Sequence, residues 1–315
     1  MEVIEEIAGD FPHFALNQAG DIRAYYEVNG YVVIRGLVSP DACDRVRGLF
    51  DEEVRPYPAP LYRQGGPPVC SHVWNEHGQM INPLLNVQSL PPTLGKFRAA
   101  ALDVLTGTDV QDAARVLLRD KPKLVQSMYF EANAATQAHQ DTYYLDAERL
   151  GGMTAGWFAL EDIALEAGRF YVCPGSQKVD IARNSGNFDI AFNHARYSEL
   201  VRRIIADNRL ELRAPALSKG DVLFWNSRTI HGALPTQDPR RSRTSMTAHY
   251  IPDASRFLQY QSRNKPLYLE TVNGMRVHKP KDLSRPWHRA VLWCRTTFPK
   301  QFRFVQRLAI KAVTR

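Results

Sequence analysis

The sequence predicts a mainly β protein, a β-sandwich or jelly roll with helices on its flanks, and two observations carry this prediction. From Lys123 onward, short apolar segments rich in β-branched and aromatic residues alternate with turn residues, a texture typical of antiparallel sheets. Before Lys123 the chain has helical patterns and loops instead. At 315 residues, 44% of them hydrophobic and 23% charged, the chain is long enough to bury a full core without disulfides or a structural metal.

The first third of the chain predicts helices around one early strand. Helical patterns cover residues 17–30, 39–55 and 93–107. Ser39 is expected to cap the second helix, because Pro40 follows at the first helical position, and Gly30 is expected to close the first helix. The β-branched segment 31–38 predicts a strand, and the segment 55–95, rich in Pro, Gly and Asn, predicts loops.

Strands are expected in the rest of the chain at residues 123–132, 153–163, 168–176, 210–216, 220–227 and 243–252. A long block, residues 177–219, begins after the third of these and is expected to be an insertion with a helix at 195–208. We expect this insertion and the loops at 55–95 to determine substrate specificity, because binding residues concentrate on loops carried by a rigid scaffold.

Positive charge is concentrated in the tail. The whole chain has a net charge of +7, but residues 276–315 hold eleven Lys and Arg against one acid, which leaves 29 bases and 32 acids in the first 275 residues. We therefore expect a domain of residues 1–265 followed by a basic, helical C-terminal extension, residues 266–315.

The end of this extension, residues 298–315, predicts an amphipathic helix. Its cationic stripe consists of Arg303, Arg307 and Lys311, and its apolar side of Phe302, Val305, Ala309 and Val313. Two interpretations stay open. The helix packs on the domain with a solvated basic face, or residues 285–315 contact an anionic membrane surface or a lipid-linked substrate. Specific nucleic-acid binding is not expected, because no recognition motif accompanies the basic residues.

The cysteines and the N-terminus predict a cytoplasmic protein, with peripheral membrane contact still compatible. The four cysteines lie far apart without CxxC pairing, as expected for reduced thiols: Cys43, Cys70, Cys173 and Cys294. The acidic N-terminus lacks the apolar segment of a secretory signal. No stretch of the sequence approaches the roughly 20 apolar residues of a membrane-spanning helix.

Residues 136–146, TQAHQDTYYLD, carry the main functional motif. His139 and Asp141 lie two residues apart on an extended segment, so their side chains point to the same side. His231, where an apolar strand ends in a turn, is the next candidate. Two imidazoles and one carboxylate cover one face of a metal and leave its other positions open, the ligand set of oxygen-activating iron(II). Such a short motif also occurs often by chance.

Arg243 follows His231 by twelve residues and begins a predicted strand. An arginine on a strand near such a metal can hold a carboxylate with two hydrogen bonds. The metal and the arginine together fit a keto acid that chelates the metal while its far carboxylate meets the guanidinium. The alternative, that Arg243 is one solvated charge in the run PRRSR, stays open at this point.

These motifs resemble the phytanoyl-CoA dioxygenase family, within the iron(II)/2-oxoglutarate oxygenases of the double-stranded β-helix fold, a jelly roll of the cupin type. The matching segments come in the order of the family: HQDTYY, GWFALEDI, GRFYVCPGSQK, KGDVLFWNSRTIHG and RTSMTAHY. The resemblance covers roughly residues 25–255 and leaves the tail without a counterpart. It implies Fe(II) as the cofactor, with 2-oxoglutarate and O2 as cosubstrates.

The resemblance also implies roles for individual residues. Three residues are expected to bind iron: His139, Asp141 and His231. Four others are expected to contact 2-oxoglutarate: Arg243, Trp157, Ser245 and Gln126. Arg243 matches the residue that holds the distal carboxylate, whereas Trp157 could also be a plain core aromatic. The chain departs from the family at Ala233, where many relatives have serine, and at Arg169, where small or aliphatic residues are common.

The expected reaction is hydroxylation of an unactivated C–H bond in a small organic or lipid-like substrate, with release of succinate and CO2. Relatives that halogenate lack the carboxylate ligand, so the presence of Asp141 favours hydroxylation. Desaturation, cyclisation and epoxidation need no different ligands and stay open, as does a β-helix that binds a ligand without turnover. The candidate substrate contacts are Gln140, Tyr143, Tyr144 and Arg169. Arg169 could face an anionic substrate or lie on the surface.

Overall fold

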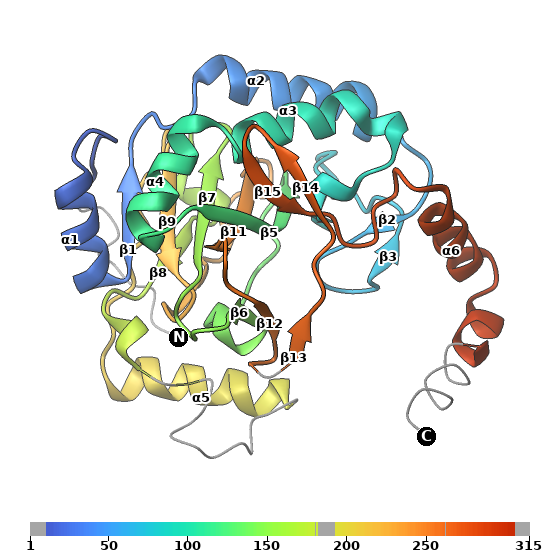
Figure 1. Cartoon of the computed structure of the whole chain (residues 1–315). Coiled ribbons are helices and arrows are strands. Elements are labelled where there is room, and N and C mark those ends of the chain that lie inside the picture. Colours follow the sequence, from blue (N-terminus) through green and yellow to red (C-terminus); the bar gives the residue numbers. More distant parts are fainter. Residues whose placement is uncertain (1–10, 180, 182–192, 262, 306–315) are drawn as a thin grey trace.

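A large mixed sheet occupies the centre of the protein, with helices along one face (Figure 1). The computed structural model describes residues 11–179, 181, 193–261 and 263–305. In spatial order the sheet consists of β1 (Tyr31–Ile34), β9 (Val222–Asn226), β7 (Thr154–Ala159), β11 (Ser245–Pro252), β5 (Pro122–Phe130), β15 (Met275–His278) and β14 (Leu269–Val272), and β4 (Leu84–Leu85) also pairs with β5. The prediction of a mainly β protein with flanking helices is confirmed.

Shorter strands complete the jelly roll. They form three small sheets: β8 (Phe170–Val172) with β10 (His231–Ala233), β6 (Leu145–Ala147) with β12 (Phe257–Gln259) and β13 (Arg263–Lys265), and β2 (Leu61–Tyr62) with β3 (Val69–Cys70). Single backbone bridges extend the first of them to His139 beside β10 and to Arg213 beside β8. The segment 210–216, which we expected to form a strand, contributes only the bridge at Arg213.

The helices are α1 (Ala19–Asn29), α2 (Pro40–Leu49), α3 (Gly95–Leu105), α4 (Thr108–Leu118), α5 (His194–Asp207) and α6 (Pro286–Thr297). In Figure 1, α2 and α3 run along the top of the molecule and α5 runs along the bottom. Phe97 of α3 and Ala113 of α4 share one buried cluster with Phe224 and Tyr250 of the large sheet. These helices therefore cover one face of the sheet and leave the other face to the small sheets of β8 with β10 and of β6 with β12 and β13.

The two faces of the large sheet bury different side chains, because neighbouring strand residues point in opposite directions. On β1, Val32 and Ile34 pack with the helices. Tyr31 and Val33 pack on the opposite face, in a second cluster that includes Trp157 of β7. This second face is the one that carries the candidate site.

Local sequence signals located most helix ends. Ser39 caps α2, with its hydroxyl accepting a hydrogen bond from the backbone N–H of Ala42 at 3.3 Å. Gly30 ends α1 with a φ of +76°, where a Cβ would also lie 2.4 Å from the amide oxygen of Gln177. The helix expected in the insertion is α5. By contrast, α4 was not predicted, although Val110, Ala113 and Ala114 recur at helical spacing on its buried side.

We expected the tail to be helical from residue 266. It begins instead with a hairpin of β14 and β15. Its turn is Asn273-Gly274, with φ of +49° and +80°, a pair of residues that favours two-residue hairpins. β15 then pairs in parallel with β5 and buries Met275 and Val277 in the core. The central sheet therefore extends past the expected boundary at residue 265.

The helical part of the tail begins at α6, which lies at the edge of the body at the right of Figure 1. None of the α6 residues, Pro286–Thr297, is buried. Residues 299–305 are helical as well, whereas Arg307, Ala309, Lys311 and Val313 of the predicted amphipathic helix lie outside the described residues. Of the helices in the described part of the chain, none is both long enough and apolar enough to span a bilayer.

Candidate active site

A cavity of about 280 Å³ lies where the large sheet meets the small strands. The large sheet contributes side chains from β5, β7, β9 and β11, and β8 and β10 contribute Phe170 and His231. His194 and Ser198 of α5 also line it. The cavity therefore has one wall of paired strands and another wall that includes the insertion.

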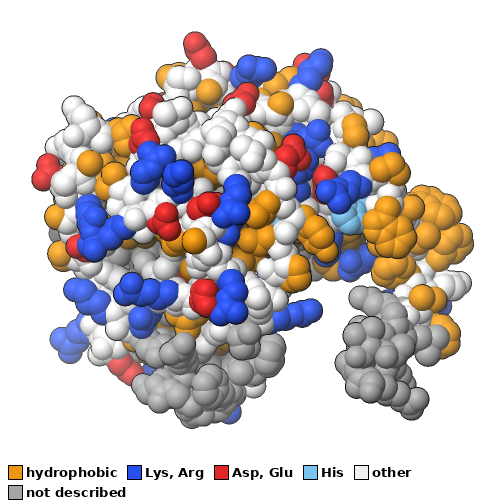
Figure 2. Space-filling model, viewed as in Figure 1, with side chains coloured by type: hydrophobic (Ala, Val, Ile, Leu, Met, Phe, Trp, Pro, Cys, Tyr) orange, Lys and Arg blue, Asp and Glu red, His pale blue; other side chains and the backbone are white. Residues whose placement is uncertain are grey.

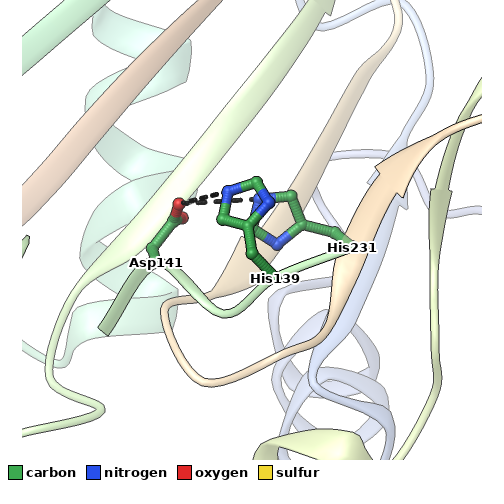
Figure 3. A group of neighbouring side chains, drawn as sticks. All are labelled: His139, Asp141 and His231. Carbon is green, nitrogen blue, oxygen red and sulfur yellow. Dashed lines mark ion pairs between the residues drawn. The ribbon is translucent and has the colours of Figure 1, made fainter. Parts of the chain in front are cut away.

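His139, Asp141 and His231 converge in this cavity (Figure 3). The Nε2 atoms of both histidines lie 3.5 Å from Oδ1 of Asp141. One ligand atom from each residue can be chosen so that all lie within 4.8 Å of one another, close enough to surround a single metal ion. The three residues come from two distant parts of the sequence, and backbone hydrogen bonds of 3.0 Å between His139 and His231 hold those parts together.

Backbone carbonyls orient both imidazoles. Nδ1 of His139 lies 2.8 Å from the carbonyl of Gln137, and Nδ1 of His231 lies 2.9 Å from the carbonyl of Thr229. A carbonyl only accepts, so each Nδ1 carries the proton and each Nε2 keeps its lone pair free on the side of Asp141. This is the arrangement that a histidine needs to bind a metal through Nε2.

The protonation states of the cluster suit a metal. Burial lowers the pKa of His231 to about 3, so its ring is neutral at physiological pH. Burial alone would raise the pKa of Asp141, but its interactions with His231, His139 and His249 outweigh burial and hold this pKa well below its ordinary value. A deprotonated Asp141 beside the neutral ring of His231 needs to lose no proton when a cation binds.

The second carboxylate oxygen of Asp141 has its own partners. Its Oδ2 accepts a hydrogen bond of 2.8 Å from the indole N–H of Trp225, and Nε2 of His249 lies 3.5 Å from the same oxygen. Both side chains are buried and line the cavity, and the sequence analysis missed both.

Arg243 lies in the cavity as a buried cation without an acidic partner among the described residues. It is 2% exposed, its Nη1 donates to the carbonyl of Gly168 at 2.9 Å, and its Nε has no partner. Its guanidinium stands 5.8 Å from the ring centre of Trp157. Burial lowers its pKa to about 10, which leaves it charged at neutral pH. A buried charge of this kind is costly unless an anion joins it, so the residue fits a bound carboxylate.

Two further polar atoms beside Arg243 lack hydrogen-bond partners. Oγ1 of Thr247 and Nδ1 of His249 are buried, and both side chains line the cavity. Together with Arg243, these residues stand at positions 243, 247 and 249. Intervals of four and two residues place all three side chains on the same face of a strand. Unpaired buried polar groups in one row indicate a site for a polar ligand. A dicarboxylate that also chelates a metal at Asp141 fits this row.

The predicted cosubstrate residues differ in position. Trp157 and Gln126 line the cavity, and Gln126 lies opposite His249 on the neighbouring strand. Ser245 does not line it, because its hydroxyl donates to the backbone carbonyl of Arg243 at 3.1 Å. The prediction for Ser245 is therefore corrected: Thr247, two residues further along the same face, presents its hydroxyl instead.

Of the predicted substrate contacts, one lines the cavity. The hydroxyl of Tyr144 reaches Nε2 of His194 at 2.7 Å at the edge of the site. The other three predicted side chains lie outside the described lining, and their contact with substrate stays a prediction. Tyr143 stacks on Tyr197, with 3.7 Å between ring centres. The amide of Gln140 donates to the carbonyls of Val179 and Arg228, and Nε of Arg169 to the carbonyl of Ile163.

The missed residues Thr247 and His249 could have been found from the sequence. They follow Arg243 by four and six residues in the predicted strand 243–252, so all three side chains point to the same side. No comparable local signal indicates Trp225, because its contact with Asp141 depends on how β9 meets a loop that lies 84 positions earlier in the chain.

The jelly roll, the cluster of two histidines and one aspartate, and the buried arginine together define an iron(II)- and 2-oxoglutarate-dependent dioxygenase. The chain belongs to the phytanoyl-CoA dioxygenase (PhyH) family, whose model matches residues 26–242. It uses Fe(II) as cofactor and 2-oxoglutarate and O2 as cosubstrates, as the class does.

Curated relatives agree with this family. The chain is 25% identical over 260 residues to phytanoyl-CoA dioxygenase domain-containing protein 1 of Bos taurus, covering 73% of this chain and 88% of that protein. It is 24% identical over 226 residues to the peroxisomal phytanoyl-CoA dioxygenase of Homo sapiens, covering 67% of this chain and 62% of that protein.

Solved structures agree on the fold. The α-ketoglutarate-dependent epimerase SnoN from nogalamycin biosynthesis superposes with a TM-score of 0.57 at 15% identity, covering 84% of this chain and 99% of SnoN. EctD from S. alaskensis, solved with 2-oxoglutarate and 5-hydroxyectoine, superposes with a TM-score of 0.55 at 16% identity, covering 88% and 90%. The double-stranded β-helix prediction is thereby confirmed.

Proposed function

We propose that the enzyme hydroxylates an unactivated C–H bond of a small organic or lipid-like substrate and releases succinate and CO2. The observation that carries this proposal is the intact set of His139, Asp141 and His231 beside the unpaired Arg243 in one cavity. The carboxylate of Asp141 occupies the place that a halide would need, which favours hydroxylation over halogenation. One oxygen atom of O2 goes to the substrate and the other to succinate, so the reaction balances.

In this proposal the residues of the cavity have different roles. His139, Asp141 and His231 hold the iron, which couples decarboxylation of 2-oxoglutarate to oxidation of the substrate. Arg243 pairs with the distal carboxylate of the cosubstrate, and Trp157 and Gln126 shape that end of the cavity. The buried strands exclude water from the reacting atoms.

The substrate is proposed to enter on the side of Tyr144 and His194. Among the described residues that line the cavity, Arg243 is the single Lys or Arg, and in this proposal it binds the cosubstrate. The polar groups left on this side include the hydroxyls of Tyr144 and Ser198, and the described lining here holds no Lys or Arg. This supports a neutral reacting group better than an anionic one. Desaturation, cyclisation and epoxidation at the same site are the competing outcomes.

Succinate formation tests the proposal. Purified protein supplied with Fe(II), 2-oxoglutarate and O2 should form succinate, with more formed when a substrate from a screen is present. His139→Ala should abolish this activity, whereas His13→Ala, a matched change at an exposed histidine, should not alter it. A protein that binds iron and 2-oxoglutarate but forms no succinate would support the alternative of a binding protein without turnover.

We also propose that this enzyme, acting in the cytoplasm, contacts an anionic membrane surface through residues 285–305. Trp287 is 70% exposed and Trp293 58%, and large apolar side chains gather over this part of the chain (Figure 2). Residues 285–305 hold five Lys and Arg and no Asp or Glu. Exposed tryptophans beside cations are typical of helices that lie in the interface of an anionic bilayer.

The alternative of a helix packed on the domain has less support. Leu292 is only partly buried against the core, and hydrogen bonds from Arg289 to the carbonyls of Leu283 and Ser284 hold only the first turn of α6. Trp287 and Trp293 are left mostly exposed.

Vesicle co-sedimentation tests this contact. The protein should pellet with vesicles that contain phosphatidylserine and much less with phosphatidylcholine alone. The variant Trp287→Ser/Trp293→Ser should lose binding, while Val28→Ser, an exposed apolar residue on α1, should retain it. Equal pelleting of all three proteins, or self-association of the unaltered chain through α6 without vesicle binding, would contradict the proposal.

A further inference from the structure

The two oxygens of Asp141 face different neighbours. Oδ1 is the oxygen nearest to His139 and His231, at 3.5 Å from each Nε2. Oδ2 points to the other side, where Trp225 donates a hydrogen bond of 2.8 Å and His249 lies at 3.5 Å. His249 is outside the group whose ligand atoms all lie within 4.8 Å of one another. The carboxylate is therefore presented to a metal by one oxygen and held by the protein through the other.

The role of Trp225 in this contact is unambiguous, because an indole N–H can only donate. The ring is 2% exposed and is confined by its neighbours: Phe170 and His231 each lie 4.9 Å away, between ring centres. The backbone of Trp225 is paired on both sides, with Tyr31 of β1 and Ala155 of β7. A donor fixed in this way cannot follow the carboxylate if Asp141 rotates.

The loop of Asp141 is tied to the segment that follows Trp225. The backbone N–H of Thr142 donates to the carbonyl of Ser227 at 3.0 Å. The hydroxyls of Thr142 and Ser227 both donate to the buried carboxylate of Asp146. Trp225 and Asp141 thus sit on two segments that are joined immediately beside their contact, and this fixes the position of the indole relative to Oδ2.

We propose that Trp225 is a positioning residue that restricts Asp141 to metal coordination through Oδ1 alone. This inference rests on the proposed function, in which Asp141 binds iron. An octahedral ion held by three protein atoms keeps two positions for the keto acid and one for O2. A carboxylate that bound through both oxygens would take one of these positions. The hydrogen bond to Oδ2, with His249 beside it, preserves the position that the reaction requires.

The direct test counts the water molecules bound to Mn(II) in the loaded protein by proton relaxation. Trp225→Phe removes the donor and keeps an aromatic ring, so Oδ2 becomes free to reach the metal. We expect Trp225→Phe to bind Mn(II) with one water fewer than the unaltered chain and to bind 2-oxoglutarate about tenfold more weakly or worse. Trp74→Phe is the matched control, the same change at a tryptophan outside the cavity lining, and should keep both the water count and the affinity for 2-oxoglutarate.

An unchanged water count in Trp225→Phe, with Mn(II) still bound, would overturn this inference and leave the proposed function intact. Failure of the unaltered chain to bind Mn(II) or Fe(II) would overturn both. A general loss of structure would weaken metal binding without removing one water selectively, so the water count separates positioning from stability.

A measurement on the unaltered chain covers the case in which Trp225→Phe does not fold. In protein labelled with ¹⁵N-tryptophan, the indole N–H of Trp225 should exchange slowly with solvent, both without metal and with Zn(II) bound. Its signal can be assigned with Trp74→Phe and Trp157→Phe, because the exposed Trp287 and Trp293 exchange fast. Loss of protection on Zn(II) binding would show that the carboxylate turns away from the indole, and would overturn the inference.

Discussion

The two walls of the cavity are built in different ways. Arg243, Thr247 and His249 lie on or just before β11, which pairs with β5 on one side and β7 on the other, and all three are buried. Tyr144 and His194 form the opposite wall, on a loop and at the first turn of α5, where the site opens to solvent. Strands paired on both sides hold atoms more rigidly than loops do. From this difference we expect cosubstrate binding to depend on the strand wall, and substrate choice on the other.

The largest effect that would test this division is loss of a metal ligand. His231→Ala should lower metal affinity by more than about 100-fold, because losing a ligand costs more than losing a residue that only hydrogen-bonds to a ligand. It should also abolish succinate formation. His194→Ala, a histidine of the opposite wall, should bind metal normally. Metal titration of both variants checks this. Comparable losses in the two would show that the walls are not separate.

Arg243→Met should weaken 2-oxoglutarate binding by about 10- to 100-fold, the value of a hydrogen-bonded charge, while metal binding is kept. Thermal unfolding without ligand should be no easier than in the unaltered chain, because the change removes a buried cation that has no acidic partner in the described structure. Arg169→Met, at an arginine outside the cavity lining, is the control for 2-oxoglutarate affinity. A destabilised Arg243→Met variant with normal affinity would indicate a structural arginine.

Thr247→Val and Ser245→Ala form a pair on one strand face. The hydroxyl of Thr247 is buried without a partner in the cavity, so its removal should weaken 2-oxoglutarate binding about 5- to 10-fold. The hydroxyl of Ser245 is already bonded to the carbonyl of Arg243, so Ser245→Ala should leave this affinity unchanged. Calorimetric titration with 2-oxoglutarate measures both, and the reverse order would restore the prediction made from the sequence.

The smallest effect is expected at the solvent-facing wall. Tyr144→Phe removes the hydrogen bond to His194 and should raise the KM for substrate about three- to fivefold, with the KM for 2-oxoglutarate unchanged. Steady-state kinetics with any substrate found by the succinate screen checks this. An equal change in both KM values would mean that the two ends of the cavity are coupled.

The sequence alone predicted the features that depend on neighbouring residues. The cap at Ser39, the end of α1 at Gly30 and the shared direction of His139 and Asp141 are all determined within a few positions. The resemblance to a known family added His231 and Arg243, which local patterns left undecided.

Features that depend on sheet order were not predictable in this way. Trp225 meets Asp141 because β9 lies between β1 and β7, and no local pattern encodes that order. The pairing of β15 with β5 is equally non-local, although the Asn273-Gly274 pair did indicate the turn between β14 and β15. Sequence periodicity reports which way a side chain points on its own strand, and not which strand will lie beside it.

The hairpin of β14 and β15 has a practical consequence for shortening the protein. A chain cut at residue 265 would leave Lys123 and Leu124 of β5 without the strand that pairs with them, and an unpaired strand edge invites other chains to add to it. Leu283 is buried and its N–H donates to the carbonyl of Ser89, so the chain is still anchored to the body just ahead of α6. A truncation meant to keep the protein monodisperse should therefore end at Ser284 or later.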